Sequence, residues 1–311
     1  MAALLALCAA PSLAAEAVER PYDPPVGSHW TIEAAASSDE ARPEGLRHQS
    51  IKTRAELSID EKTADGFRIT YVNRGATAEG NVPMLPIMLS ALKALENVPI
   101  HATTDLAGKP VRVDNLDEAK AAMRNMLGTM MEPFHDKPQL VAVLAQMVNG
   151  LIEVDANQAA ATYMEELPAL AKAQNTGMKP GEVRRSTKTV DNPLGGAAGL
   201  KLNATFELTE DDAATGKLVF VQTSSYDEAS MKELMQSVTN KLLAATGDPA
   251  QTERIAKLVK EMVLTQDERT TFEVEEGMTR KIAKKSVTVA HLLGHSLTKT
   301  ETKTVTVTPA P

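Results

Sequence analysis

The chain has 311 residues, a formal net charge of -8 from 33 basic and 41 acidic side chains, and only 3% aromatic residues. No basic cluster is interleaved with aromatics, so the pattern argues against a nucleic-acid partner. Once the leader that holds the single cysteine, Cys8, is removed, the composition also excludes disulfides, a cysteine nucleophile and thiolate-bound metals.

The first residues, MAALLALCAAPSLAAEA, form an uncharged apolar run that ends in small residues. Ser12 and Ala14 fit the positions that a signal peptidase reads, so residues 1–15 are expected to be a signal peptide cleaved near Ala14 or Ala15. The residue before Cys8 is leucine rather than a small residue, so no lipid anchor is expected. The run is too short to span a bilayer, and no later segment qualifies. The sequence therefore predicts an exported, periplasmic protein.

The first part of the mature chain predicts the order strand, strand, helix, strand, strand. Alternating apolar residues flank the Asp65-Gly66 turn, which indicates a β-hairpin. The stretch MLPIMLSALKALE follows with an apolar stripe of helical period, and TTDLAGKPVRV then turns at Gly108. We assign these elements to a first ββαββ unit, residues 16–115.

A helical insertion is predicted over residues 116–178. Asn115 and Glu118 have the spacing of an N-cap and a capping box, which opens a first helix. Pro138 starts a second helix, and a third is predicted from Ala156 to Ala173.

The second part of the chain repeats the plan of the first. A hairpin in LNATFELTEDDAATGKLVFVQTSSY is followed by the helical stripe of ASMKELMQSVTNKLL and by a turn in TFEVEEGMTRKI. These elements predict a second, related ββαββ unit over residues 179–290 and hence an internal duplication. Residues 291–311 are expected to form a C-terminal hairpin arm. Alternatively, residues 26–308 form one continuous domain.

The terminal stretch LTKTETKTVTVTP carries threonine at every second position from Thr298 to Thr308. An extended chain places all six on one side. Lys299 and Lys303 on the other side are typical of an edge strand that resists pairing. If the protein instead docks a partner through a sheet edge, Leu297–Thr308 is the edge concerned. The threonines then face helices or a semi-polar hollow, or they are simply good β-formers on a solvated face.

Histidines give little support for a metal site. His291 and His295 are four residues apart, as two ligands on one helix would be, but their flanks are strand-like and Gly294 suits a hairpin tip. A third ligand is missing, so we interpret the pair as part of a turn.

The acidic pairs Asp211-Asp212 and Glu275-Glu276 lie next to turns and are interpreted as solvated turn acids rather than catalytic carboxylates. Neither a nucleophile elbow nor a phosphate-binding loop occurs in the sequence. The chain is therefore expected to be no enzyme and to need no cofactor.

Methionines are numerous, at 14, and fall mostly on the helical stripes. Flexible thioethers suit surfaces that accept variable apolar shapes, although ordinary core filling explains such stripes as well. The candidate ligand-binding residues are Met88, Leu92, Met123, Met126, Met130, Met147, Met231 and Met235.

This order of leader, antiparallel hairpins, apolar helix and closing meander resembles the half-barrel lipoprotein carriers and lipid-binding lipoproteins of bacterial envelopes. The GKPVRV hairpin after a helix is also similar to exported bacterial proteins of unknown function. The predicted elements and these resemblances together predict an α+β fold. It is a large curved antiparallel sheet, half-barrel-like, built from two related ββαββ units with amphipathic helices on one face. The expected function is non-catalytic binding of a lipid-like or other apolar ligand between sheet and helices. The alternative is an envelope interaction or structural protein that docks through a sheet edge or the helical insertion.

Overall fold

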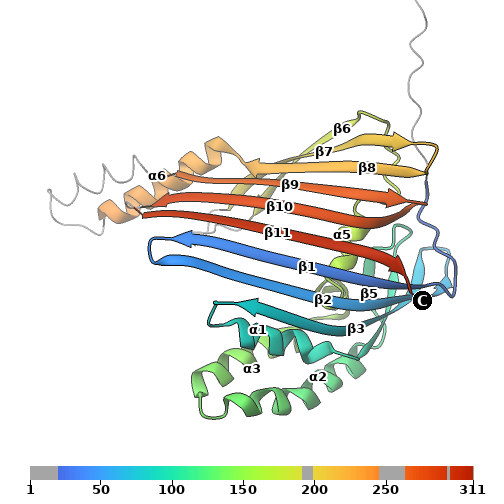
Figure 1. Cartoon of the computed structure of the whole chain (residues 1–311), viewed down its shortest axis with the longest axis horizontal. Coiled ribbons are helices and arrows are strands. Elements are labelled where there is room, and N and C mark those ends of the chain that lie inside the picture. The colour runs from blue at the N-terminus through green and yellow to red at the C-terminus, as the bar shows by residue number, and fades with distance from the viewer. Residues whose placement is uncertain (1–19, 191–198, 245–262, 293–294, 311) are drawn as a thin grey trace, which may run out of the picture.

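The computed structural model describes residues 20–190, 199–244, 263–292 and 295–310 (Figure 1). The expected signal peptide lies outside these residues. Among them, no helix has the length and apolar character that crossing a membrane requires.

One antiparallel sheet contains strands from both ends of the chain. Its strands are β1 (His29–Arg42), β2 (Gly45–Lys62), β3 (Phe67–Gly80), β4 (Pro99–Thr104), β5 (Pro110–Val113), β6 (Val183–Val190), β7 (Leu200–Asp212), β8 (Lys217–Tyr226), β9 (Val263–Glu275), β10 (Met278–Leu292) and β11 (His295–Pro309). They lie in the order β5-β4-β3-β2-β1-β11-β10-β9-β8-β7-β6 (Figure 1). The prediction of a large antiparallel sheet is confirmed, and the sheet is open because β5 and β6 form its two edges.

The helices lie between strands in the chain, and four of them form one stretch between β5 and β6. They are α1 (Leu85–Leu92), α2 (Leu116–Met131), α3 (Pro138–Ile152), α4 (Ala156–Tyr163), α5 (Glu166–Ala171) and α6 (Glu228–Ala244), with short 3-10 turns η1 (Lys93–Leu95) and η2 (Glu132–Phe134). Helix α1 connects β3 to β4, and α2 to α5 lie between β5 and β6 in the chain. Figure 1 shows α1, α2 and α3 gathered beside β3.

The C-terminal strand β11 lies in the middle of the sheet. It pairs with β1 on one side and with β10 on the other, so both of its edges are covered. The prediction that Leu297–Thr308 is an edge guarded by Lys299 and Lys303 is therefore wrong. Strand addition by a partner at this edge loses its basis. The alternation in β11 correctly indicates a strand, but it contains no information about which other strand pairs with it.

The two faces of the sheet differ in polarity. Because side chains alternate and paired residues share a face, the register assigns every strand residue to one side. The core face carries Val305, Val307 and Ile32, which are at most 3% exposed. The opposite face, called here the threonine face, carries the alternating threonines from Thr298 to Thr308, all exposed or partly exposed. The threonines are on a solvated face, and two of them, Thr304 and Thr306, also line a hollow on it.

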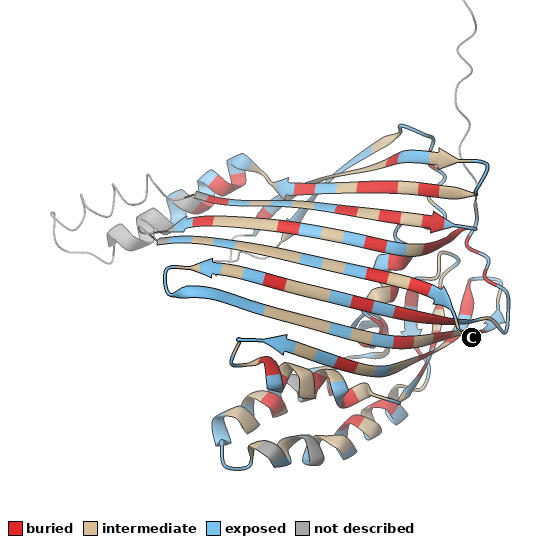
Figure 2. Cartoon of the chain, in the orientation of Figure 1, coloured by how far each residue is buried: buried red, intermediate tan, exposed pale blue. Residues whose placement is uncertain are grey.

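Buried side chains form one main core and one smaller cluster (Figure 2). The main core joins the core face of the sheet to the helices, and Tyr22 packs edge-on against Phe67 with ring centroids 5.3 Å apart. The smaller cluster forms where α6 meets the sheet and consists of Leu200, Met231, Leu234, Leu264 and Ala290.

The predicted start of α2 is confirmed, but the predicted third helix is not continuous. Asn115 is at the N-cap position of α2, and its Nδ2 lies 3.3 Å from Glu118. Its side chain makes no capping hydrogen bond to the helix, because its Oδ1 accepts the His101 N–H at 2.9 Å and its Nδ2 donates to the Pro99 carbonyl at 2.9 Å. The predicted third helix is divided into α4 and α5. Pro168 cannot continue a helix over the carbonyl four residues earlier, and at that position, Met164, the backbone leaves the helix with φ -126° and ψ 54°.

The order strand, strand, helix, strand, strand does occur twice, as β2-β3-α1-β4-β5 and β7-β8-α6-β9-β10. The lengths differ, because β4 and β5 have 6 and 4 residues whereas β9 and β10 have 13 and 15. Descent of both parts from one duplicated unit stays a prediction.

Candidate functional site

The eight apolar residues expected to bind a ligand fall into two groups. Helices α1, α2 and α3 carry Met88, Leu92, Met123, Met126, Met130 and Met147, whereas α6 carries Met231 and Met235. Met123 is fully buried in the main core, and Met231 belongs to the smaller cluster. Met88, Leu92 and Met126 are partly exposed. The side chains of Met130, Met147 and Met235 lie outside the described part of the structure.

Helix α3 contacts both α1 and α2 beside β3, and these three helices are called here the helical lobe (Figure 1). Helix α1 buries Ile87 and Ala91 against the main core. Met88 and Leu92 are one helical turn apart and lie next to each other on the surface of the same helix. Since both remain partly exposed, α1 has apolar side chains beyond those that the core uses.

A hollow of about 940 Å³ lies over β6 to β10. A row of five residues crosses it, each directly opposite the next on the neighbouring strand: Arg185, Thr205, Thr223, Arg269 and Lys285. Lys285 in turn lies opposite Thr302, so the row belongs to the threonine face. The hydroxyl oxygens of Thr205 and Thr223 are 2.7 Å apart in the middle of the row.

The three cations of the row have no carboxylate partner among the described residues, since none comes within 4.0 Å of Arg185, Arg269 or Lys285. Two acidic residues line the hollow. Glu268 belongs to the core face and pairs with Lys284 at 2.5 Å, whereas Asp267 shares the threonine face with the cations. The side chains that line the hollow from the threonine face thus have an excess of positive charge.

A second hollow, of about 490 Å³, lies on the threonine face over β1 to β3 and β11. Lys52, Arg54 and Lys93 contribute positive charge, and Glu33 and Glu96 contribute negative charge. Because Glu33 lies directly opposite Arg54, the charges there are more balanced than over β6 to β10.

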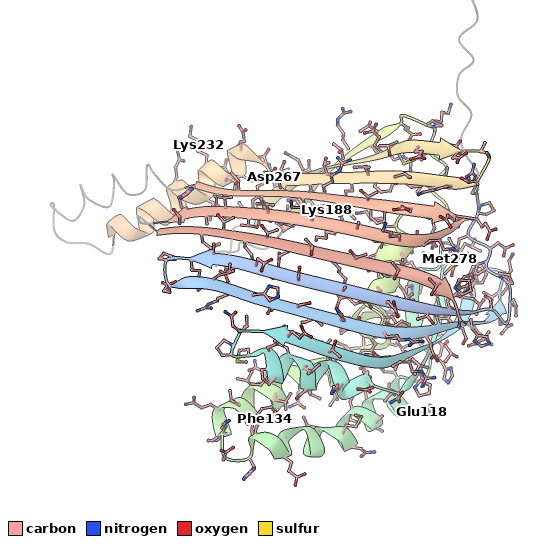
Figure 3. The ribbon with its side chains drawn as sticks, in the orientation of Figure 1. Glu118, Phe134, Lys188, Lys232, Asp267 and Met278 are labelled. Carbon is pink, nitrogen blue, oxygen red and sulfur yellow. The ribbon has the colours of Figure 1, made fainter. Side chains whose placement is uncertain are left out.

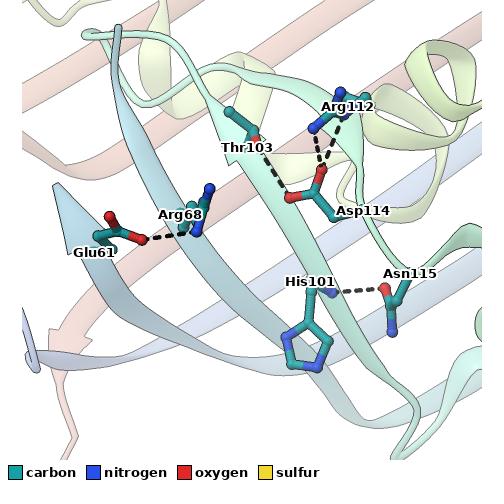
Figure 4. Close-up of polar contacts among 7 residues, drawn as sticks. All are labelled: Glu61, Arg68, His101, Thr103, Arg112, Asp114 and Asn115. Atoms are coloured by element: carbon teal, nitrogen blue, oxygen red, sulfur yellow. Dashed lines mark hydrogen bonds and ion pairs between the residues drawn. The ribbon is translucent and has the colours of Figure 1, made fainter. Parts of the chain in front are cut away.

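A third hollow, of about 1010 Å³, lies beside β3, β4, β5 and the start of α2. Figure 4 shows its polar contacts. Arg112 donates to Asp114 from Nε at 2.9 Å and from Nη2 at 2.8 Å, and Thr103 donates to the other oxygen of Asp114 at 2.9 Å. Arg68 donates to Glu61 at 2.9 Å. Both arginines are therefore already neutralised by carboxylates of the chain itself.

Charged groups near the main core are also paired. The Nζ of Lys303 lies 2.7 Å from Glu165 and 3.7 Å from Glu166. Burial lowers the pKa of Lys303, but the bonds to these carboxylates outweigh burial and the pKa is raised. Glu166 also accepts from the Tyr71 hydroxyl at 3.4 Å, and burial followed by this negative charge raises the pKa of Tyr71. These contacts join the start of α5 to the sheet and are structural.

The histidine and acidic pairs lie at turns. His291 is near the end of β10, where Leu292 faces His295 across the hairpin, and its Nδ1 lies 2.7 Å from the Ser296 hydroxyl. In the part of the chain that the structure describes, no group of three metal-ligating side chains occurs. Asp212 accepts hydrogen bonds from the Ala214 N–H at 2.9 Å and from the Thr215 hydroxyl at 2.7 Å, as expected for a turn acid.

The cationic row is the feature that sequence analysis missed. Figure 3 labels Asp267, which is on the same face as the row, and Lys188 of β6, which is on the core face. Arg185, Arg269 and Lys285 lie on three different strands, and each is one of several charged residues in its strand. Only the register aligns them, and the register of five strands cannot be predicted from one sequence.

No family model and no curated protein matches this chain. Among solved structures, one titled for lipid–protein interactions in lipovitellin is similar over 92% of this chain, with 10% identity and a TM-score of 0.41. The chain spans only 26% of the length of that lipovitellin chain. An outer membrane channel from Pseudomonas putida F1 aligns over 93% of this chain and 98% of its own, with 6% identity and a TM-score of 0.19. Ail, the attachment invasion locus protein of Yersinia pestis, aligns over 91% and 100%, with 5% identity and a TM-score of 0.12. These similarities define no family.

Proposed function

We propose that this protein is a non-catalytic, exported binding protein that holds a lipid-like or other apolar ligand at the helical lobe. The observation that supports the proposal is the partly exposed pair Met88 and Leu92 on α1, together with Met126 on α2. Export is supported by the apolar leader that ends in small residues.

The ligand is placed at the partly exposed side of the lobe because its inner side is filled. Met123 on α2 and Leu144 and Val148 on α3 are all 0% exposed and pack in the main core. An apolar ligand at Met88 and Leu92 would remove their exposed area from water, at about 25 cal/mol per Å². Unbranched thioethers adapt to different ligand shapes, which suits a carrier of variable chains.

Docking of an envelope protein at a sheet edge is not favoured by a specific observation. The expected edge, β11, is covered on both sides. The edge strand β6 carries Arg184, Arg185 and Lys188, and charged side chains on an edge are a common protection against strand addition.

Titration with the neutral apolar probe 1-N-phenylnaphthylamine tests the proposal. Saturable binding to the wild-type protein is expected, with at least about tenfold weaker binding for Met88→Glu and Met126→Glu, because a buried carboxylate is costly. Leu46→Glu is the matched control, since Leu46 is a 61% exposed apolar residue at the β1–β2 turn. Circular dichroism checks that each variant is folded. Equal probe binding by the lobe variants and the control, or no saturable binding at all, would contradict the proposal.

A further inference from the structure

Arg269 on β9 and Lys285 on β10 lie directly opposite each other on the threonine face. Like charges at directly opposite positions of an antiparallel pair are destabilising. Neither residue has a carboxylate within 4.0 Å among the described residues, so no described carboxylate offsets this repulsion at close range. A bound anion would offset it.

The third cation, Arg185, lies on β6 in the same row. Strands β6 and β9 are three spacings apart, which separates the backbones of Arg185 and Arg269 by about 14 Å. The side chains between them, Thr205 and Thr223, are small and hydroxylated. The row thus has two cations at one end, one at the other, and hydrogen-bonding groups between.

The charge of the hollow is opposite to that of the protein. Three cations and one carboxylate, Asp267, lie on this face of the hollow, whereas the whole chain has a formal net charge of -8. Guanidinium groups bind phosphate and carboxylate in a two-pronged geometry, and a concave site strengthens the local field.

We propose that this hollow binds an extended molecule carrying at least two phosphate groups, with one group at Arg269 and Lys285 and another toward Arg185. A single small anion would occupy only one end of the row. The phosphates can belong to a soluble polyphosphate or to a lipid headgroup with two phosphates, since the recognition chemistry is the same. The site lies on β6 to β10, apart from the helical lobe beside β3, so it is independent of the proposed apolar site (Figure 1).

Two binding assays on the full chain test this site and separate the two sources of phosphate. Isothermal titration calorimetry measures the affinity for tripolyphosphate and, for comparison, for inorganic phosphate. Co-sedimentation uses phosphatidylcholine vesicles with and without cardiolipin, whose headgroup carries two phosphates. Tighter binding of tripolyphosphate than of inorganic phosphate supports a soluble ligand. Cardiolipin-dependent sedimentation without tripolyphosphate binding supports a lipid source.

The test variant is Arg269→Ala/Lys285→Ala, which we expect to weaken the observed binding at least about tenfold, because charge-assisted hydrogen bonds are lost. The double variant Arg124→Ala/Lys232→Ala removes the same charge from exposed positions on α2 and α6 and should bind like the wild type. Binding should also weaken with added salt.

Stability provides a second readout. Lys285→Glu places a carboxylate opposite Arg269, so it should raise the urea midpoint of the ligand-free protein while abolishing phosphate binding. This variant keeps the proposal testable if the double alanine variant folds poorly. Binding that both pairs of substitutions weaken equally, or no binding in either assay, would overturn the proposal. Probe binding at the helical lobe should be unchanged in all of these variants.

Discussion

The hydroxyl oxygens of Ser37 on β1 and Thr302 on β11 lie 2.8 Å apart. A side-chain hydrogen bond thus joins the strands that come first and last in the chain, which are neighbours at the centre of the sheet. The two residues are separated by 265 positions in the chain. The paired segment runs from Trp30 opposite Pro309 to Ala41 opposite Thr298. The centre of the sheet can therefore form only after both ends of the chain are available, which is typical of slow folding.

Substitutions at neighbouring positions of β11 should separate its two faces. Val305 is 1% exposed and lies between Ala34 and Ile282 on the core face, so Val305→Ala should cost about 1–3 kcal/mol through lost burial and a cavity. Thr304→Ala on the threonine face is the control and should change stability by less than about 0.5 kcal/mol. Urea denaturation measures both. Equal losses for the two variants would show that the assignment of faces is wrong.

Two turn glycines with the same backbone conformation should respond differently to alanine. Gly277 has φ +77° and Gly216 has φ +74°. Alanine at either position would lower the free energy of unfolding by about 1 kcal/mol, because its Cβ is strained in this left-handed conformation. A Cβ on Gly277 would lie 2.1 Å from the carbonyl oxygen of Pro21, whereas at Gly216 the nearest atom is a flexible Arg20 nitrogen at 3.9 Å. Gly277→Ala should therefore lower the melting temperature clearly more than Gly216→Ala. Equal shifts would mean that the N-terminal segment does not pack against the β9–β10 turn.

Glu273 should contribute to stability at neutral pH but not in acid. Lys217 contacts its carboxylate at 2.8 Å and Lys281 at 3.2 Å, and the Lys217 hydrogen bond is the largest cause of its lowered pKa. The contribution is present above the unfolded pKa, about 4.3, and is lost as the pH falls through the lower folded value. Glu273→Gln should thus cost up to about 1 kcal/mol at pH 7, less in high salt, and progressively less as the pH falls below about 4.

The control for this experiment is Glu275→Gln, two residues along the same strand and exposed. Urea midpoints at pH 7 and pH 3 should change little for this control. A Glu273→Gln variant as stable as the wild type at pH 7 would show that the two lysine contacts do not hold the carboxylate in solution.

Local pattern was enough to predict most elements of the fold. Period-two alternation predicts the hairpins β2–β3 and β7–β8, and helical stripes predict α1, α2, α3 and α6. The helix start at Asn115 was predicted correctly, but its capping hydrogen bond was not, because the Asn115 amide bonds to backbone groups of β4 instead. The break between α4 and α5 had a local signal in Pro168, since proline inside a helix removes a hydrogen bond and clashes with the preceding turn.

Pairing between distant segments could not be predicted. The threonine alternation in β11 fits an edge strand and a central strand equally well, and the choice depends on β1, more than 250 residues away in sequence. The row of cations could not be predicted for the same reason, because only the order and register of β6 to β10 align Arg185, Arg269 and Lys285. The methionine stripes were readable from sequence, whereas their division between the helical lobe and α6 required the structure.

Native mass spectrometry of the protein purified from the envelope of its own host can detect an apolar ligand that stays bound to the helical lobe. The protein is sprayed intact, then denatured and extracted with organic solvent. We expect a roughly stoichiometric apolar molecule on the wild-type protein and on Leu46→Glu, and its loss from Met88→Glu. An unliganded mass for the wild type, with nothing recovered in the organic phase, would contradict the claim that the helical lobe binds an apolar ligand.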